Sequence, residues 1–224
     1  MSRSTHFAFQ TLGAALLAFT LPAQGPGGGG NNSVIAYIQT LPLETIDANE
    51  LLLLTHMREE EKLARDVYLT LFQQWQVPIF QNIAQSEQSH MDLVAFALQR
   101  YQLPDPVVSN QVGVFSDPLF TLLYDFATEL GALSLPHALL VGNLIEDLDI
   151  VDLEHALYFT DNRDVDTVWQ NLLKGSRNHF RAFYPQLASY GVYYPGFFTD
   201  PAVLQAILAT PTETGALDED GNPL

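Results

Sequence analysis

A glutamate and a histidine occur three residues apart in a segment with helical periodicity. Glu87 and His90 fall on the apolar stripe that also contains Ile83 and Leu93. The i, i+3 spacing places both side chains on one helix face, where they can bind one metal ion together. Such a pair is not specific by itself, because acidic helices contain it often and a histidine on an apolar face is more commonly a hydrogen-bonded core residue.

A second acidic residue lies where the helical period predicts the core. Glu61 is the one acid of the charged run from Arg58 to Lys62 that falls on the same stripe as Tyr68. We expect its neighbours Glu59 and Glu60 to lie on a solvated helix face. We expect Tyr68 to be a core residue whose hydroxyl can support a nearby metal ligand.

Two further segments repeat this arrangement in part. Glu146 and Asp149 share the inner face of one predicted helix, and His179 lies on the next, with Ser176 where a second Glu-x-x-His unit would have its glutamate. Buried carboxylates are costly unless they are paired or bind metal. The chain has no cysteine, so iron–sulfur and rubredoxin-type centres are excluded and a metal must be held by His, Asp and Glu. The candidate ligands are Glu61, Glu87, His90, Glu146, Asp149 and His179.

These residues must be positioned by helices. Apolar periodicity, capping residues and breakers predict long helices over about 48–74, 78–101, 134–158 and 164–190, with a short extra helix over 117–130. The first two and the last two are joined by short turns, so each pair should form an antiparallel hairpin. A long crossover connects the hairpins, which predicts an all-α, ferritin-like antiparallel four-helix bundle.

The motifs also resemble a known family. The run from Glu61 to Tyr68 is similar to the Glu-x-x-Ala-Arg-x-x-Tyr pattern of the rubrerythrin-like branch of the ferritin superfamily, and Ala84 to His90 to its Ala-x-x-Glu-x-x-His pattern. Glu146 with Asp149 resembles its third-helix Glu-x-x-Glu, with the second acid one methylene shorter. The sequence from Arg58, with Gly-Ser-Arg-Asn-His from Gly175, is closer still to an uncharacterised ferritin-like family of bacteria and archaea. The resemblance covers about residues 48–187.

The resemblance implies a dinuclear site, usually of iron. By this carry-over, Glu61 and His90 would bind one ion, Glu87 and Glu146 would bridge, and His179 with Asp149 would serve the other. Ser176 is too weak a ligand to replace a carboxylate, which places the second ion in question. Arg177, on the adjacent face, is expected to pair with an acid.

The flanking segments set the expected organisation of the chain. Residues 1–23 are typical of a secretory signal peptide, with an apolar run from Leu12 to Phe19 that is too short to span a bilayer; the alternative is a buried N-terminal helix. Residues 24–46 are expected to form a Gly-rich linker and an irregular lead-in, 47–191 the bundle, and 192–224 an aromatic and then acidic tail that is disordered from Pro211 onward. The prediction is an exported protein, periplasmic or extracellular.

Charge and length limit the partners. The 224 residues suit one domain, and the net charge of −17 disfavours nucleic acid and anionic lipid as partners and favours cations and small neutral molecules. No stretch after the leader approaches membrane-spanning length. The expected partners are metal ions and O2 or peroxide, with an external electron donor; a homodimer is one of the oligomeric states left open.

Three functions remain open from the sequence. The first is a di-iron oxidase or peroxidase that acts on O2 or peroxide. The second is a non-catalytic metal-binding or sequestering protein with one ion, and the third is a structural bundle with a satisfied polar network. Iron is the expected metal, although nitrogen and oxygen ligands also accept manganese and zinc.

Overall fold

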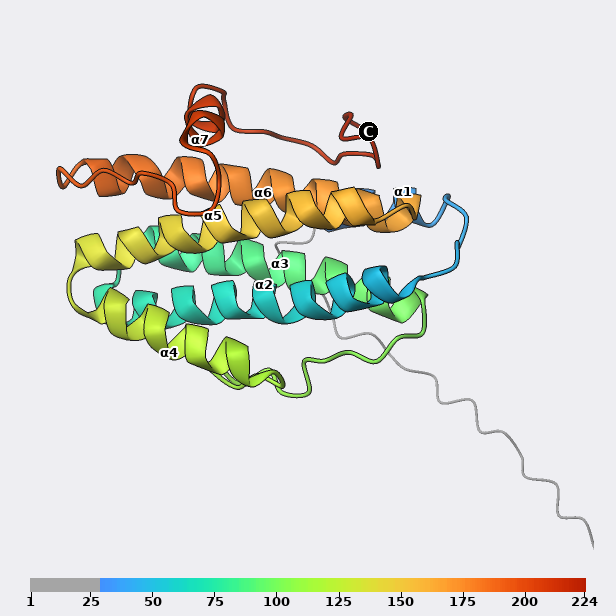
Figure 1. The fold of residues 1–224 in the computed structure, drawn as a ribbon, viewed down its shortest axis with the longest axis horizontal. Coiled ribbons are helices and arrows are strands. Elements are labelled where there is room, and N and C mark those ends of the chain that lie inside the picture. The colour runs from blue at the N-terminus through green and yellow to red at the C-terminus, as the bar shows by residue number, and fades with distance from the viewer. Residues whose placement is uncertain (1–28) are drawn as a thin grey trace, which may run out of the picture.

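The protein is all-helical over the part described by the structure, a computed structural model that covers residues 29–224 (Figure 1). Within this range there are seven helices and no β-strand, only an isolated bridge between Leu217 and Pro223. The expected signal peptide and the first part of the linker lie outside the described residues. The helices are α1 (Gly29–Ile38), α2 (Ala48–Trp75), α3 (Pro78–Arg100), α4 (Pro118–Ala132), α5 (Leu135–Phe159), α6 (Arg163–Ala188) and α7 (Pro201–Leu208).

The first hairpin is defined by local sequence features. Asp47 caps α2 by accepting hydrogen bonds from the backbone N–H groups of Asn49 and Glu50, at 2.7 and 2.9 Å, while the Glu50 carboxylate accepts from the N–H of Asp47 at 2.9 Å. At the other end, Gln76 adopts a left-handed conformation with φ of 54°, and Pro78 occupies the first turn of α3. This tight connection turns α3 back along α2.

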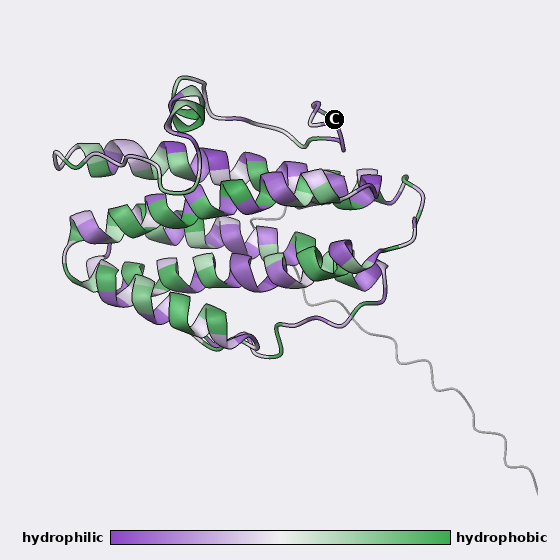
Figure 2. Cartoon of the chain, in the orientation of Figure 1, coloured by the Kyte–Doolittle hydropathy of each residue, from purple (hydrophilic) through white to green (hydrophobic). Residues whose placement is uncertain are grey.

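The second hairpin is formed by α5 and α6, and its helices complete the core. Ser134 caps α5 through the N–H of His137, and Asn162 precedes α6. Figure 1 shows α2, α3, α5 and α6 lying lengthwise beside one another, and polar and apolar residues alternate along each of them in Figure 2. Trp169, Phe180 and Phe183 of α6 are fully buried between them. The apolar faces of the four long helices therefore share one core.

The charged run of α2 differs from the prediction. Glu59 and Glu60, expected on a solvated face, are 4% and 5% exposed. The crossover covers this face: the Glu59 carboxylate accepts hydrogen bonds from the N–H groups of Ser116 and Asp117, at the start of α4. The expectation was wrong because helical periodicity identifies the face toward the main core but not a second face covered by a distant segment.

The same crossover is held by the cations of the run. Arg58 donates to the carboxylate of Asp105, and Lys62 donates to the backbone carbonyl of Gln111 at 2.9 Å and pairs with Asp66. Burying these charges is tolerable because each has a partner. Arg58 and Lys62 are therefore paired with groups other than Glu60.

Both ends of the described chain are more ordered than expected. The lead-in contains α1, because Val34 and Ile38 lie one turn apart and are buried against α3 and α6. The tail beyond Pro211 is tied to α6: Arg177 pairs with Glu213, as an acid partner was expected, and Asn171 donates to the carbonyl of Leu217 at 2.8 Å. Composition alone did not reveal these long-range hydrogen bonds.

No helix in residues 29–224 combines the length and the apolar character required to cross a bilayer.

Candidate metal centre

Glu87 lies between the two histidines of the core. One of its carboxylate oxygens, Oε2, is 2.8 Å from Nδ1 of His90, and the other, Oε1, is 2.9 Å from Nδ1 of His179. His90 is on the same face of α3, and His179 comes from α6 across the core. The two imidazole rings are stacked with centroids 5.4 Å apart. A single carboxylate therefore joins two histidines that are far apart in the sequence.

Each histidine has a second carboxylate neighbour. Glu61 Oε2, from α2, lies 3.1 Å from Nδ1 of His90, and Glu146 Oε2, from α5, lies 3.3 Å from Nδ1 of His179. Both glutamates are 1% exposed. All four long helices thus contribute a side chain, and five of the six predicted residues are linked by direct contacts centred on Glu87.

Asp149 does not contact His179 directly. Its Oδ2 accepts a hydrogen bond from Ser176, and no hydrogen bond or ion pair joins it to either histidine within residues 29–224. Ser176, at the position where a glutamate was expected, therefore has a polar partner, because its hydroxyl donates a hydrogen bond to one oxygen of Asp149.

Neighbouring hydroxyl groups hold two side chains of the centre in place. The Tyr68 hydroxyl donates to Glu146 Oε1, which matches the supporting role predicted for Tyr68. The outer nitrogen of His179, Nε2, is 2.9 Å from the Ser86 hydroxyl, so Nδ1 remains directed at the carboxylates. An oriented histidine with its second nitrogen engaged is typical of metal ligands.

A glycine makes room for the other histidine. A Cβ atom at Gly175 would lie 2.3 Å from Nε2 and 2.4 Å from Cε1 of His90, closer than real Cβ contacts allow. Glycine inside a helix is otherwise destabilising, so its presence in α6 is explained by this close approach. The roles of Ser86 and Gly175 were not predicted from the sequence; a glycine within a helical pattern was the one available indication.

The charges of the centre are unbalanced. Burial by itself would raise the pKa of Glu87, but His179 and His90 lower it below its usual range. Burial lowers the pKa of His179, yet Glu87 and Glu146 raise it to about 10. Burial, and then the carboxylates around it, raise the pKa of Asp149 well above its usual range. Four buried acids share two imidazoles, so the centre would carry more negative charge than its histidines can compensate if all four acids were ionised.

Two buried oxygens of the centre lack a hydrogen-bond partner within residues 29–224. They are Glu61 Oε1 and Asp149 Oδ1, and both are inaccessible to solvent. Leaving such atoms unpaired is costly, and a metal ion would satisfy them. Oxygen and imidazole nitrogen donors suit iron, manganese and zinc. The residues present therefore fit the metal ions expected from the sequence.

The histidines face a pocket of about 320 Å³. His90, His179, Ser86, Gly175 and Asn31 of α1 are among the residues that line it. His90 and His179 are 8% and 7% exposed, so a small molecule in this pocket would reach the edge of the centre.

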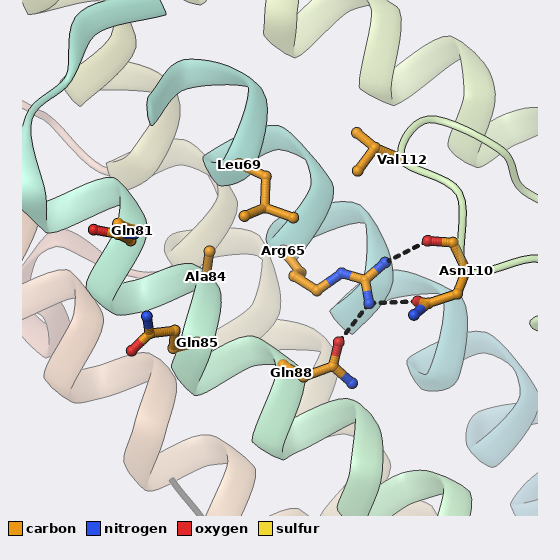
Figure 3. A pocket seen from close by; sticks show the side chains of 8 residues that line it. All are labelled: Arg65, Leu69, Gln81, Ala84, Gln85, Gln88, Asn110 and Val112. Carbon is orange, nitrogen blue, oxygen red and sulfur yellow. Dashed lines mark hydrogen bonds between the residues drawn. The ribbon is translucent and has the colours of Figure 1, made fainter. Parts of the chain in front are cut away.

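A second pocket, of about 330 Å³, lies against α2 and α3 and has different chemistry (Figure 3). Arg65 lies at its edge and is held by the side-chain oxygens of Gln88 and Asn110, at 2.5 and 2.6 Å. Its lining contains neither an acid nor a histidine. This pocket offers no metal-binding group.

Comparisons with known proteins show relatives along most of the chain. The chain is 49% identical over 182 residues to an uncharacterized protein of Methanocaldococcus jannaschii, MJ0754, which covers 81% of this chain and 98% of that protein. It is also similar to the crystal structure of that hypothetical protein, with a TM-score of 0.76 and 50% identity over 77% of this chain and 99% of the other. Residues 49–210 match the model of a family described as an uncharacterized protein domain, DUF2202. The chain therefore belongs to the DUF2202 family.

Proposed function

We propose that this chain is a ferritin-like metal-binding protein whose core holds two ions, iron by preference, and acts on O2 or peroxide. The bundle would be formed by α2, α3, α5 and α6, with Glu87 as the bridging ligand. The resemblance to rubrerythrin-like proteins supports the dinuclear form.

The position of Glu87 carries this proposal. Its two oxygens lie within 3 Å of two different histidines, which is the arrangement a carboxylate needs to bridge two ions. Glu61 would complete the first position with His90, and Glu146 the second with His179. The unpaired oxygens of Glu61 and Asp149 supply further donors.

The chain's own residues would prepare the centre for metal and substrate. Ser86 and Tyr68 fix the orientations of His179 and Glu146, and the surrounding core excludes bulk water. Two bound ions would supply electrons to a small oxidant and take them back from an external donor. The pocket beside His90 and His179 is the route by which such a small molecule would reach the centre.

One structural feature favours the second candidate, a single-ion or sequestering protein. Ser176 and Asp149 are joined by a hydrogen bond, so the part of the centre where the second ion would need another carboxylate is partly satisfied without metal. A cation concentrated by the acidic chain could then occupy only the Glu61, Glu87 and His90 position.

Metal analysis of the purified protein tests the binding. The wild type is loaded with ferrous iron without oxygen, freed of excess metal, and compared with Glu87→Gln, His90→Ala and a surface control, His155→Ala, at an exposed position of α5. Iron content is counted relative to the double variant His90→Gln with His179→Gln, which removes both imidazoles beside Glu87. We expect two more ions per chain in the wild type and the control than in this double variant, and at most one more in Glu87→Gln. A difference of one ion for the wild type would select the second candidate, and no difference after careful loading would eliminate both.

Activity requires its own measurement. The iron-loaded protein is mixed with O2 or hydrogen peroxide and a chemical reductant, and consumption of the oxidant is followed against the Glu87→Gln variant. Turnover that is lost in Glu87→Gln supports the oxidase or peroxidase. If the loaded wild type consumes neither oxidant, the catalytic part of the proposal fails and metal binding alone remains.

A further inference from the structure

A second group of ligand-type side chains lies at the contact of α2 and α5, outside the proposed centre. His56 and Glu60, one turn apart on α2, approach Asp152 of α5, and one donor atom from each lies within 4.8 Å of the other two. His56 Nε2 is 3.5 Å from Glu60 Oε2. His56 is held against the ring of Phe120, whose centroid is 5.1 Å away. The three donors thus converge from two helices.

Glu60 is the unexplained member of this group. It is 5% exposed, and its Oε2 is inaccessible to solvent yet accepts no hydrogen bond from the described part of the chain. The carboxylates of Asp149 and Asp152, on α5, are close enough to disfavour a negative charge on Glu60. The neighbouring cations of α2 are already paired, Arg58 with Asp105 and Lys62 with Asp66. Within residues 29–224, only the imidazole of His56 lies within ion-pair distance of Glu60. A buried acid beside other acids requires either a proton or a cation.

The geometry points to a second divalent-cation site formed by His56, Glu60 and Asp152. It goes beyond the proposed function, because none of these residues belongs to the Glu87 centre. One imidazole nitrogen and two carboxylates within a few ångströms of one another suit zinc, manganese or ferrous iron. The side chain of His56 is 40% exposed, so the ion would be reached from solvent and keep water in its remaining positions.

The alternative is a site without metal. In that case Glu60 and Asp152 share a proton, His56 packs against Phe120, and the cluster only completes the contact of the helices. Burial does raise the pKa of Glu60 well above its usual range, so both outcomes are chemically reasonable. The two outcomes are distinguished by the His56 ring, whose NMR resonances shift on addition of zinc only if the metal site forms.

The test separates this site from the centre by disabling the latter. His90→Gln with His179→Gln removes both imidazoles near Glu87, and zinc binding to this background is measured by equilibrium dialysis and by NMR of ¹⁵N-labelled histidine. We expect one bound zinc per chain and a shift of the His56 ring resonances. Adding His56→Gln or Asp152→Asn should weaken zinc binding about 10- to 100-fold. Glu154→Gln, an exposed acid of the same helix, is the matched control and should change nothing.

Wild-type protein provides the same test without the double substitution. Asp152→Asn should lower its zinc content by one ion per chain and leave the melting temperature close to that of Glu154→Gln, because Asp152 is partly exposed. The inference is overturned if zinc leaves the His56 resonances in place, or if His56→Gln and Asp152→Asn bind as much zinc as the control. If the wild type binds zinc at the His56 site but binds no metal at the Glu87 centre, only the proposed function is contradicted.

Discussion

Replacing Gly175 with alanine tests whether the packing around His90 is as tight as the structure shows. The new Cβ would lie 2.3 Å from His90 Nε2, whereas ordinary contacts begin near 3.4 Å. The imidazole would have to move by about 1 Å to restore a normal separation. Its Nδ1 now lies 2.8 Å from Glu87 and 3.1 Å from Glu61, so such a movement would take it out of hydrogen-bond range of one of these acids.

The expected loss of stability follows from two opposing effects. Forcing an extra methyl group into a well-packed core costs about 1–3 kcal/mol. Alanine in place of glycine inside a helix returns up to about 1 kcal/mol. Gly175→Ala should therefore lower the free energy of unfolding by up to about 2 kcal/mol, and a displaced His90 should weaken metal binding about 10- to 100-fold.

A double-mutant cycle with His90→Ala gives the control. In that background the clash is absent, so Gly175→Ala should be neutral or stabilising by up to about 1 kcal/mol. Unfolding in urea followed by circular dichroism measures stability, and competition with a chelator measures metal affinity. Unchanged stability of Gly175→Ala together with unmoved His90 ring resonances would contradict the close contact between Gly175 and His90.

Three other substitutions have defined outcomes. Asp147→Ala removes a buried carboxylate that accepts from Tyr194 at 2.7 Å and from three backbone N–H groups, so unfolding in urea should show a loss of about 3 kcal/mol, and proteases should cut the released tail. Burial, and then neighbouring acids, raise the pKa of Asp166 to about 7, above the usual aspartate value. Its ionisation in the folded protein therefore costs stability as the pH rises from about 4 to 7. Asp166→Asn should raise the melting temperature more at pH 8 than at pH 5. Ser176→Glu places a carboxylate beside Asp149 and should tighten binding of a second ion, measured by stoichiometry and chelator competition.

Matched controls make each outcome interpretable. Asp125→Ala, at an exposed position of α4, should leave stability unchanged, and an equal loss there would contradict the role given to Asp147. Asp161→Asn, at an exposed neighbour, should show a smaller pH dependence than Asp166→Asn. Ser176→Asn should not add a second ion; if Ser176→Glu behaves in the same way, the placement of α6 beside the proposed centre is wrong.

The helices could be predicted closely because their boundaries are specified by nearby residues. Asp47 and Glu50 form the predicted capping box, Pro78 begins α3, and Ser134 caps α5. The helical period likewise identified Glu87, His90 and Tyr68 as core-facing, and all three are buried. These features depend on contacts within a turn or two of the chain, which the sequence displays directly.

The second face of α2 could not be predicted in this way. Glu59 and Glu60 were expected in solvent, but the crossover supplies the N–H groups that Glu59 needs, and Glu60 lies beside Asp152 of α5. The helix at 29–38 and the anchoring of the acidic tail were missed for the same reason, since both depend on partners far away in the sequence. Pattern and composition contain no information about which distant segment covers which face.

The sequence by itself determined which side chains share a helix face, and so placed Glu87 beside His90 and Glu146 near Asp149. Only the tertiary structure decided that Glu87 also reaches His179, 89 residues away from His90, and that Asp149 is paired with Ser176 and not with a histidine. The physical reason is that spacing along a helix is fixed by backbone geometry, whereas the distance between helices depends on how their side chains pack, including the missing side chain of Gly175.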